Sequence, residues 1–155
     1  MILSIDAFAR LRKEISGVLV ATSGGFDPLH VGHIRNLQAA RGLGDALVVI
    51  ANGDGYLLRK KGYAFMPEGD RLEILDALRC VDYVVPYDDG TPVVSAAIAL
   101  LRPDVFAKGV ELPRPSELPE WEACRAVGAR VVLGVGGPKI RSSSELAARA
   151  PRRGR

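Results

Sequence analysis

Residues 18–33 read VLVATSGGFDPLHVGH, and this stretch decides the fold. Its first part, VLVAT at 18–22, is a short apolar run rich in β-branched residues, and it predicts a buried strand. The turn-rich SGGFDPLH at 23–30 follows, and a helix is expected over about 31–42, ending at a glycine. A buried strand that passes through a glycine-rich loop into a helix is the start of a βαβ unit.

The rest of the chain continues this alternation of short apolar strands with helices. Further strands are expected at 46–52, 83–87, 104–108 and 129–134. Further helices are expected at 5–15, 69–79, 91–101, 119–127 and 143–149. The pattern predicts an α/β fold in which a five-stranded parallel sheet carries helices on both faces.

Two local features of this pattern are specific enough to check against a structure. The segment at 53–68 is rich in Gly, Lys, Arg and Pro, so it predicts a long exposed loop. Thr91 followed by Pro92 predicts a capped helix start, with the proline at the first helical position.

Length and charge indicate one nearly neutral domain with a basic end. The 155 residues predict an N-terminal helix packed on the domain over 1–16, the domain itself over 17–148 and a disordered tail over 149–155. Four arginines of that tail account for the net charge of +3, since 17 basic residues then remain against 18 acidic ones. We therefore expect no nucleic-acid partner, and no membrane partner either, because no apolar run approaches the ~18 residues of a membrane helix.

The cysteines and the N-terminus indicate a reducing compartment. Cys80 and Cys124 lie far apart, in contexts that predict apolar helices, so we expect two buried free thiols. The N-terminus lacks the basic start and long apolar stretch of a signal peptide. A cytoplasmic location is expected.

The residues suited to chemistry follow the predicted strands, where parallel sheets bind their ligands. After the first strand, Gly24 and Gly25 let the backbone turn tightly and approach a ligand. The next helix begins with free N–H groups that attract anions. His30 and His33 are three residues apart, so both rings can project from one side of this helix start, with Gly32 between them. Two imidazoles at such a site can donate N–H groups to phosphate oxygens and neutralise developing charge.

Each part of this pattern, taken alone, has an alternative interpretation that involves no nucleotide. A Gly-Gly loop can be structural, and the histidines could be a buried pair or zinc ligands, although no third or fourth ligand is in view. The complete string GGFDPLHVGH, however, resembles the signature of the cytidylyltransferase-like nucleotidyltransferases, a Gly-x-Phe-Asp stretch followed by His-x-Gly-His. The resemblance implies a Rossmann-like, three-layer nucleotidyltransferase fold. It also implies an enzyme that joins an NTP to a phosphorylated small molecule and releases pyrophosphate.

The same resemblance implies roles for the residues of the motif. The two histidines contact the nucleotide phosphates and stabilise the transition state, and Asp27 orders the loop on the side of the substrate phosphate. The implied nucleotide-binding residues of this segment are Gly24, Gly25, Phe26, His30, Gly32 and His33.

The segment after the second strand, NGDGYLLRKKG at 52–62, resembles the family's loop for the substrate phosphate. The resemblance implies that Asn52, Asp54 and Arg71 belong to this subsite, with Arg71 reaching back from the next helix. It further implies that Lys60 or Lys61 meets the phosphate, with Lys60 assigned to catalysis. The alternative is a solvated basic loop without a ligand.

The loop after the fourth strand begins with Lys108 and reads KGVE, close to the Lys-Gly-Gly-Asp of ADP-heptose synthases. Val110 and Glu111 replace the second glycine and the aspartate, which weakens any inference about the substrate. A lysine at the carboxyl end of a strand has few structural reasons to exist, and the resemblance implies that Lys108 binds the nucleotide.

The last loop reads KIRSSSEL at 139–146 and resembles the hydroxyl cluster with which the family closes its site. Hydroxyl and N–H groups at such a helix start bind the β- and γ-phosphates. The implied nucleotide-binding residues are Ser142, Ser143 and Ser144, with Ser143 assigned to catalysis. Helix capping is the structural alternative for a serine here. Lys139 or Arg141 would supply a positive charge beside the cluster.

These residues suggest direct in-line attack of a substrate phosphate on the α-phosphorus of the NTP. Mg²⁺ is expected as cofactor, held mainly by the NTP phosphates and by no protein metal site. The RPDV strand and the KGVE loop favour ATP and a sugar 1-phosphate, as in heptose adenylyltransferases. The lysine-bearing loop equally resembles CTP-dependent glycerol-3-phosphate cytidylyltransferases. A catalytically inactive nucleotide-binding regulator is the alternative of another class, and a homodimer is expected from the family.

Overall fold

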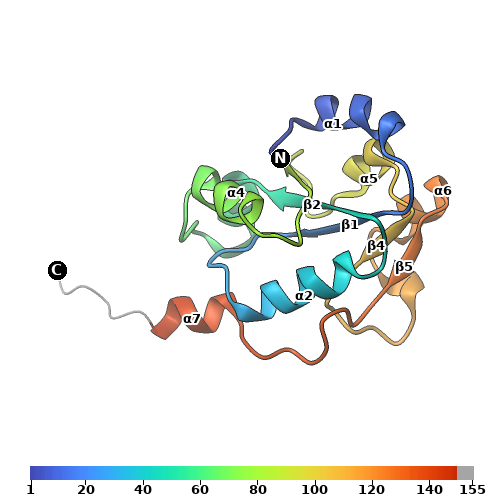
Figure 1. Cartoon of the computed structure of the whole chain (residues 1–155). Coiled ribbons are helices and arrows are strands. Elements are labelled where there is room, and N and C mark those ends of the chain that lie inside the picture. Colours follow the sequence, from blue (N-terminus) through green and yellow to red (C-terminus); the bar gives the residue numbers. More distant parts are fainter. Residues whose placement is uncertain (150–155) are drawn as a thin grey trace.

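A five-stranded sheet forms the centre of the computed structural model, which describes residues 1–149 (Figure 1). All neighbouring strands pair in parallel, in the order β3-β2-β1-β4-β5. The strands are β1 (Leu19–Gly24), β2 (Ala46–Asn52), β3 (Tyr83–Tyr87), β4 (Val105–Ala107) and β5 (Arg130–Val132). The five-stranded parallel sheet predicted from the sequence is confirmed.

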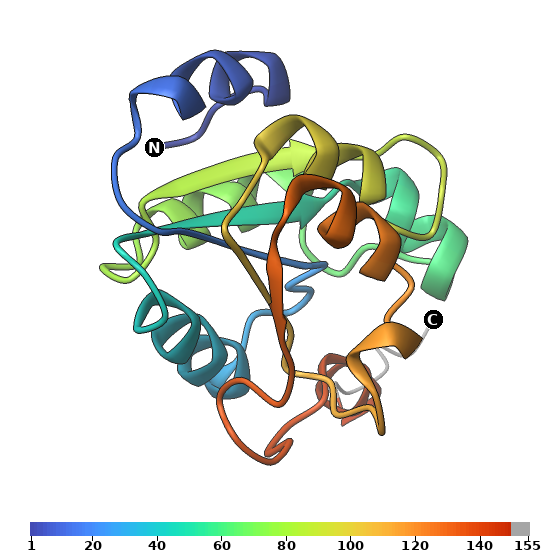
Figure 2. The same cartoon turned by 90° about the vertical axis from the view of Figure 1, so that its right-hand side faces the viewer.

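Helices cover both faces of the sheet, which makes three layers (Figures 1 and 2). One face carries α1 (Ile5–Leu11), the 3₁₀ turn η1 (Arg12–Glu14), α5 (Ser95–Leu101) and α6 (Trp121–Val127). The other face carries α2 (Val31–Arg41) and α4 (Glu68–Asp76). The short elements α3 (Asp54–Lys61), η2 (Pro115–Glu117) and α7 (Ser143–Arg149) belong to the loops.

The strands are apolar throughout because both of their faces are buried. Successive residues of β2 alternate between two hydrophobic clusters: Val48 and Ile50 face the layer of α1, α5 and α6, whereas Leu47 and Val49 face α2 and α4. Phe8 of α1 is completely buried in the first of these clusters. The N-terminal helix is therefore part of the core.

The strand order places a switch point between β1 and β4. β1 pairs with β2 on one side and with β4 on the other, and the chain returns from each strand through a helix. Crevices at such points bind ligands beyond the carboxyl ends of the strands. The loop at 24–30 leaves β1 at this edge of the sheet.

The expectation of a long exposed loop over 53–68 is wrong, because α3 occupies Asp54–Lys61. Only Leu57 of this helix is buried, so its sequence shows almost no apolar periodicity. The three basic residues that suggested a loop form its last turn. Gly62, in the left-handed conformation with φ of 83°, ends the helix.

The expected cap at Thr91 is also wrong. Helix α5 begins at Ser95, after a capping position at Val94 that provides no side-chain hydrogen bond. The Thr91 hydroxyl instead donates to Asp89 Oδ1 (2.7 Å) and to the carbonyl oxygen of Val93 (3.0 Å). The acidic turn before it thus competes for the hydroxyl.

Two expectations about the cysteines and the tail need adjustment. Cys124 is buried in α6, but Cys80 is only partly buried and lies in a turn after α4. Of the basic tail expected over 149–155, only Arg149 is described, as the last residue of α7. No helix within residues 1–149 combines the length and the apolar character needed to cross a membrane.

Candidate functional site

A cavity of about 730 Å³ opens at the carboxyl ends of β1 and β4. Its wall consists of the loop after β1, the start of α2, the end of α3, the loop after β4 and the segment between β5 and α7. Most of the residues singled out in the sequence line it: Gly24, Gly25, Phe26, Asp27, His30, Gly32, His33, Lys60, Lys61, Lys108, Ser142, Ser143 and Ser144. Asn52, Asp54 and Arg71 are not part of its wall.

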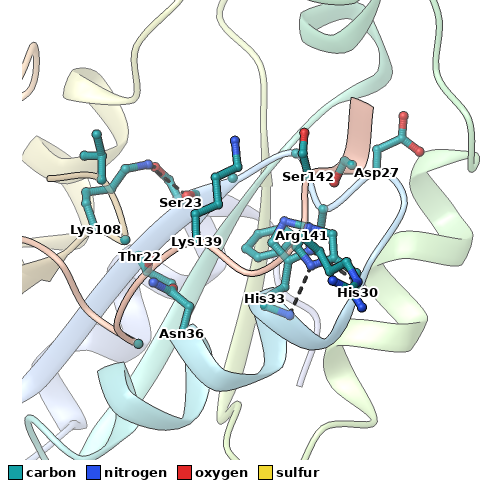
Figure 3. A pocket seen from close by; sticks show the side chains of 18 of the residues that line it. Thr22, Ser23, Asp27, His30, His33, Asn36, Lys108, Lys139, Arg141 and Ser142 are labelled. Carbon is teal, nitrogen blue, oxygen red and sulfur yellow. Dashed lines mark hydrogen bonds between the residues drawn. The ribbon is translucent and has the colours of Figure 1, made fainter. Parts of the chain in front are cut away.

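The two histidine side chains cap the N-terminus of α2 by accepting backbone N–H groups of its first turn. The Nδ1 atom of His30 accepts a hydrogen bond from the N–H of Gly32 (3.1 Å), and Nδ1 of His33 accepts one from the N–H of His30 (3.2 Å). The two rings stack, with centroids 3.8 Å apart and 27° between their planes. A neutral imidazole whose Nδ1 accepts a hydrogen bond carries its proton on Nε2. Both histidines are thus fixed as Nε2–H donors at the cavity (Figure 3).

Charged neighbours and burial keep this pair neutral. Burial, followed by the charge on His30, lowers the pKa of His33 to about 4. The pKa of His30 is lowered as well, by burial first and then by the positive charges of Lys139 and Arg141. At neutral pH, and before a ligand binds, the site therefore offers two uncharged hydrogen-bond donors.

Gly32 and Phe26 shape the immediate surroundings of the histidines. A Cβ atom at Gly32 would lie 2.9 Å from Cε1 of His30, so this position leaves room for the imidazole itself. Phe26, with the uncommon φ of 52°, turns its ring against the edge of His33, 5.1 Å between centroids. The Phe26 ring thus packs against His33.

Asp27 fastens the first loop to the segment after α3. Its buried carboxylate accepts hydrogen bonds from the N–H groups of Phe65 and Met66, both at 2.7 Å, and from Nζ of Lys61 at 3.1 Å. Burial raises the pKa of Asp27, but these hydrogen bonds and the charge of Lys61 outweigh it, so its pKa lies below the usual value. Asp27 is thereby occupied within the protein, as is Lys61.

Lys60 differs from its neighbour Lys61 in this respect. The Nζ atom of Lys60 lies 5.6 Å from the centre of the Tyr56 ring, and no carboxylate within residues 1–149 pairs with it. Both lysines line the cavity. Lys60 is therefore the cation of this pair that is available to a ligand.

Arg71 lies behind the cavity, where it holds backbone carbonyls together. Its guanidinium donates to the carbonyl oxygens of Gly25 (2.8 Å), Asn52 (2.7 Å) and Met66 (3.1 Å), and to Oδ1 of Asp54 (2.6 Å). With 1% of its surface exposed, Arg71 has no face toward a ligand. The substrate contact expected for Arg71 is thus not what the geometry provides.

Asp54 and Asn52 join the same scaffold. Asp54 and Glu68 accept each other's backbone N–H groups at 3.2 Å, which ties the start of α3 to the start of α4. Asn52 contributes its carbonyl oxygen to Arg71, at the end of β2. Asn52 and Asp54 thus lie beside Arg71 and outside the cavity wall, and their contact with a substrate phosphate stays a prediction.

Lys108 extends from the end of β4 toward the end of β1. Its Nζ donates to the carbonyl oxygen (2.9 Å) and to Oγ (3.0 Å) of Ser23. Burial lowers the pKa of this amine, and the nearby Lys60 lowers it further, while Glu120 raises it. The amine thus lies buried at the ends of β1 and β4, where it is held by Ser23.

The serine cluster closes the opposite side of the cavity. Ser143, the first residue of α7, donates from Oγ to the carbonyl oxygen of Pro28 at 3.0 Å. This bond holds the cluster on the loop that precedes the histidines. Ser142 and Ser144 line the same wall, and Lys139 and Arg141 precede them (Figure 3).

The charge of the wall indicates the chemistry of its ligand. Five cationic side chains line the cavity: Lys60, Lys61, Lys108, Lys139 and Arg141. The only carboxylate in the wall is Asp27, which Lys61 already neutralises. No group of three or more His, Cys, Asp or Glu side chains suited to a metal ion occurs within the described part of the chain. The cavity fits a ligand with several negative charges.

Sequence reasoning missed two residues of this wall that make specific contacts: Ser23, which accepts from Lys108, and Asn36. Asn36, on α2, donates from Nδ2 to the carbonyl oxygen of Val135 at 2.6 Å. Its position three residues after His33 places it on the same face of the helix, and that spacing was the only available signal.

Comparisons with known proteins agree with the resemblance seen in the motifs. Residues 21–135 match the family model described as cytidylyltransferase-like. The chain is 44% identical over 151 residues to the bifunctional protein HldE of Streptomyces coelicolor, covering 92% of this chain and 30% of that protein. It is 40% identical over 143 residues to the bifunctional protein HldE of Syntrophotalea carbinolica, covering 84% of this chain and 29% of that protein. The chain thus spans less than a third of the length of these curated relatives.

Two solved structures share the fold. The lipopolysaccharide core biosynthesis protein from Thermoplasma volcanium has a TM-score of 0.65 and 26% identity, over 76% of this chain and 96% of that one. The pantoate-β-alanine ligase from Francisella tularensis has a TM-score of 0.67 over 95% of this chain and 72% of that one. Its 13% identity makes this second likeness one of fold alone.

Proposed function

Because the chain belongs to the cytidylyltransferase-like family of nucleotidyltransferases, we propose that it transfers a nucleotidyl group from an NTP to a phosphorylated small molecule. ATP is the favoured NTP and a sugar 1-phosphate the favoured acceptor, with pyrophosphate as the second product. One observation carries the proposal: two neutral imidazoles, fixed as Nε2–H donors, face a cavity with five cationic side chains and one neutralised carboxylate.

The reaction that fits this cavity is an in-line displacement. An oxygen of the acceptor phosphate attacks the α-phosphorus of the NTP, the bond to the bridging oxygen breaks, and pyrophosphate leaves with the electron pair. The attacking phosphate is already ionised, so no general base is required. Catalysis then consists of positioning and charge stabilisation.

The residues of the wall divide naturally between these tasks. His30 and His33 donate Nε2–H bonds to phosphate oxygens that gain negative charge as the leaving group departs. Lys60, free of a carboxylate partner, holds the acceptor phosphate, and the hydroxyl groups of Ser142 and Ser144 hold the departing phosphates, while Ser143 keeps the cluster in place. Lys108 stands at the end of β4 to contact the nucleotide.

Mg²⁺ is proposed as the metal that accompanies the NTP. The single carboxylate of the wall accepts three hydrogen bonds from the protein, so phosphate oxygens and water would be the main ligands of the ion. When bound, it would neutralise charge on the triphosphate.

The choice of ATP and a sugar 1-phosphate rests on similarity. The RPDV strand and the KGVE loop resemble ADP-heptose synthases, and the curated relatives carry the name HldE. CTP with glycerol 3-phosphate or another alcohol phosphate is the second candidate, favoured by the resemblance of the lysine-bearing segment at 52–62. The site itself favours neither base.

A matrix of ATP, CTP, GTP and UTP against sugar 1-phosphates and polyol phosphates tests the proposal, with pyrophosphate release as the readout. Turnover is expected with one preferred pair and to depend on Mg²⁺. Thermal-shift titration with each NTP runs in parallel. Binding of an NTP without turnover on any acceptor would contradict the proposed reaction and favour a nucleotide-binding regulator.

Two further expectations accompany this proposal. We expect the protein to work in the reducing cytoplasm, in keeping with its two free cysteines. We also expect a homodimer, supported by apolar side chains that are exposed on α3 and α4, among them Leu58 and Ile74. Analytical ultracentrifugation of the full chain measures its oligomeric state.

A further inference from the structure

Asn36 stands where three parts of the cavity wall meet. Its Nδ2 atom donates to the carbonyl oxygen of Val135, in the loop after β5. A Cβ atom at Gly109, in the loop after β4, would lie only 2.6 Å from the same Nδ2 atom. One amide on α2, one turn after His33, therefore lies against the loops that follow β4 and β5.

The backbone after β5 rests directly on α2 at this residue. Gly136 has a φ of +91°, and a Cβ atom there would lie 2.7 Å from Cα and 2.9 Å from the backbone nitrogen of Asn36. A side chain at Gly136 would push this backbone away from the helix. The junction thus has two independent parts, the Asn36–Val135 hydrogen bond and the close approach that glycine permits.

The junction fixes one end of a segment over the cavity, residues 136–142, which we call the strap. Its other end is fixed by the hydrogen bond from Ser143 to the carbonyl of Pro28. Between these points Arg141 donates only to its neighbour Ile140, and Lys139 makes no hydrogen bond or ion pair with any residue in 1–149. The place of these two cations is therefore set by where the strap is fastened.

We propose that Asn36 is a positioning residue that fastens the strap to α2, so that its two cations lie beside the histidine pair when the nucleotide binds. The catalytic part of this inference rests on the proposed function. Asn36 follows His33 along α2, and Figure 3 shows it on the side of the same cavity that also holds Lys139 and Arg141.

His30 offers a direct report on the place of the strap. The charges of Lys139 and Arg141 contribute to the lowered pKa of His30, after burial. The stacked His33 and these two cations are the ionisable neighbours that face it. Since the chain contains only two histidines, their proton resonances can be followed individually by NMR.

The experiment compares Asn36→Ala and Gly136→Ala with the wild type, and uses Gln38→Ala as the matched control. Gln38 is an exposed amide on the same helix. Circular dichroism and thermal unfolding establish that each variant is folded. Histidine pKa values are then measured by NMR without ligand, and kcat and KM are measured for both substrates with Mg²⁺.

The expected result is a His30 pKa that rises toward 6.5 in Asn36→Ala and in Gly136→Ala but not in Gln38→Ala. For both variants kcat/KM for the NTP should fall about tenfold, the scale of one well-placed hydrogen bond, while KM for the acceptor changes less than twofold. Lower thermal stability with an unchanged His30 pKa in Asn36→Ala would reduce the residue to a structural role and overturn the proposal.

Two other outcomes separate the inference from the proposed function. A raised His30 pKa together with unaltered kcat/KM for the NTP would overturn the claim that the strap assists the reaction. A wild type without nucleotidyl transfer would refute the proposed function, and the assignment of Asn36 as the fastening of the strap would then be decided by the histidine titration alone.

Discussion

Replacement of His33 separates the two tasks that the structure gives this side chain. Its Nδ1 accepts the backbone N–H of His30, which stabilises the start of α2, while its Nε2–H is free for a phosphate oxygen. His33→Ala removes both, whereas His33→Glu keeps the first, because glutamate at this helix position also accepts the capping N–H, while its carboxylate has no hydrogen to donate to a phosphate oxygen. The pair of variants therefore distinguishes stability from catalysis.

The magnitudes follow from these two contacts. Loss of one transition-state donor costs about 10²–10³-fold in kcat. Loss of the capping hydrogen bond costs about 1 kcal/mol of the free energy of unfolding. His33→Ala should show both effects, and His33→Glu should regain most of the stability without regaining the rate.

The assay is pyrophosphate release with the preferred substrate pair, together with urea unfolding of each variant at pH 7. A variant that lacks His33 can lose rate only through catalysis or through an altered loop, and the glutamate variant controls for the loop. Full activity in His33→Glu would refute the argument that the Nε2–H donor carries catalysis. A rate loss in His33→Ala that matches its loss of folded protein would refute it as well.

Three further predictions follow from the surroundings of the site. The pKa of His33 is lowered from 6.5 to about 4, so the unfolded chain takes up a proton at this residue first as the pH falls. The free energy of unfolding should therefore decrease between pH 6.5 and about 4, and it should decrease less in His33→Gln. Urea unfolding at several pH values across this range measures the decrease. Asp27→Asn places an amide against two N–H donors and should lower the free energy of unfolding by about 1–3 kcal/mol, read from the same unfolding curves; an unchanged stability would mean that the loop does not depend on this anchor. Lys60→Met should raise KM for the acceptor about tenfold at unchanged stability, whereas Lys61→Met should mainly destabilise the fold. Steady-state kinetics of both variants decide which lysine binds the acceptor phosphate. Equal kinetic effects would contradict the assignment of this role to Lys60.

The sheet could be predicted from the sequence because its strands are buried on both faces. Val48 and Ile50 face one helix layer and Leu47 and Val49 the other, so β2 appears as a continuous apolar run rich in β-branched residues. Helix α3 could not be predicted, because a single buried leucine leaves no periodic pattern. Its first turn is held instead by Glu68, fourteen residues away.

The site shows the same division between what is local and what is distant. The histidine motif is local, and its spacing sufficed to place both rings on one helix start. The role of Arg71 depends on carbonyl oxygens from three other segments, which no spacing in the sequence shows. Asn36 meets Val135 across 99 residues, so only the folded chain shows that contact.

The most direct test of the account is pyrophosphate release by the purified full chain with ATP, Mg²⁺ and a sugar 1-phosphate, with the nucleotide product identified by mass spectrometry. The account predicts one pyrophosphate for each nucleotidyl ester formed and a rate at least 10²-fold lower in His33→Ala. An NTP that binds in the cavity but yields no pyrophosphate with any sugar or polyol phosphate would contradict it.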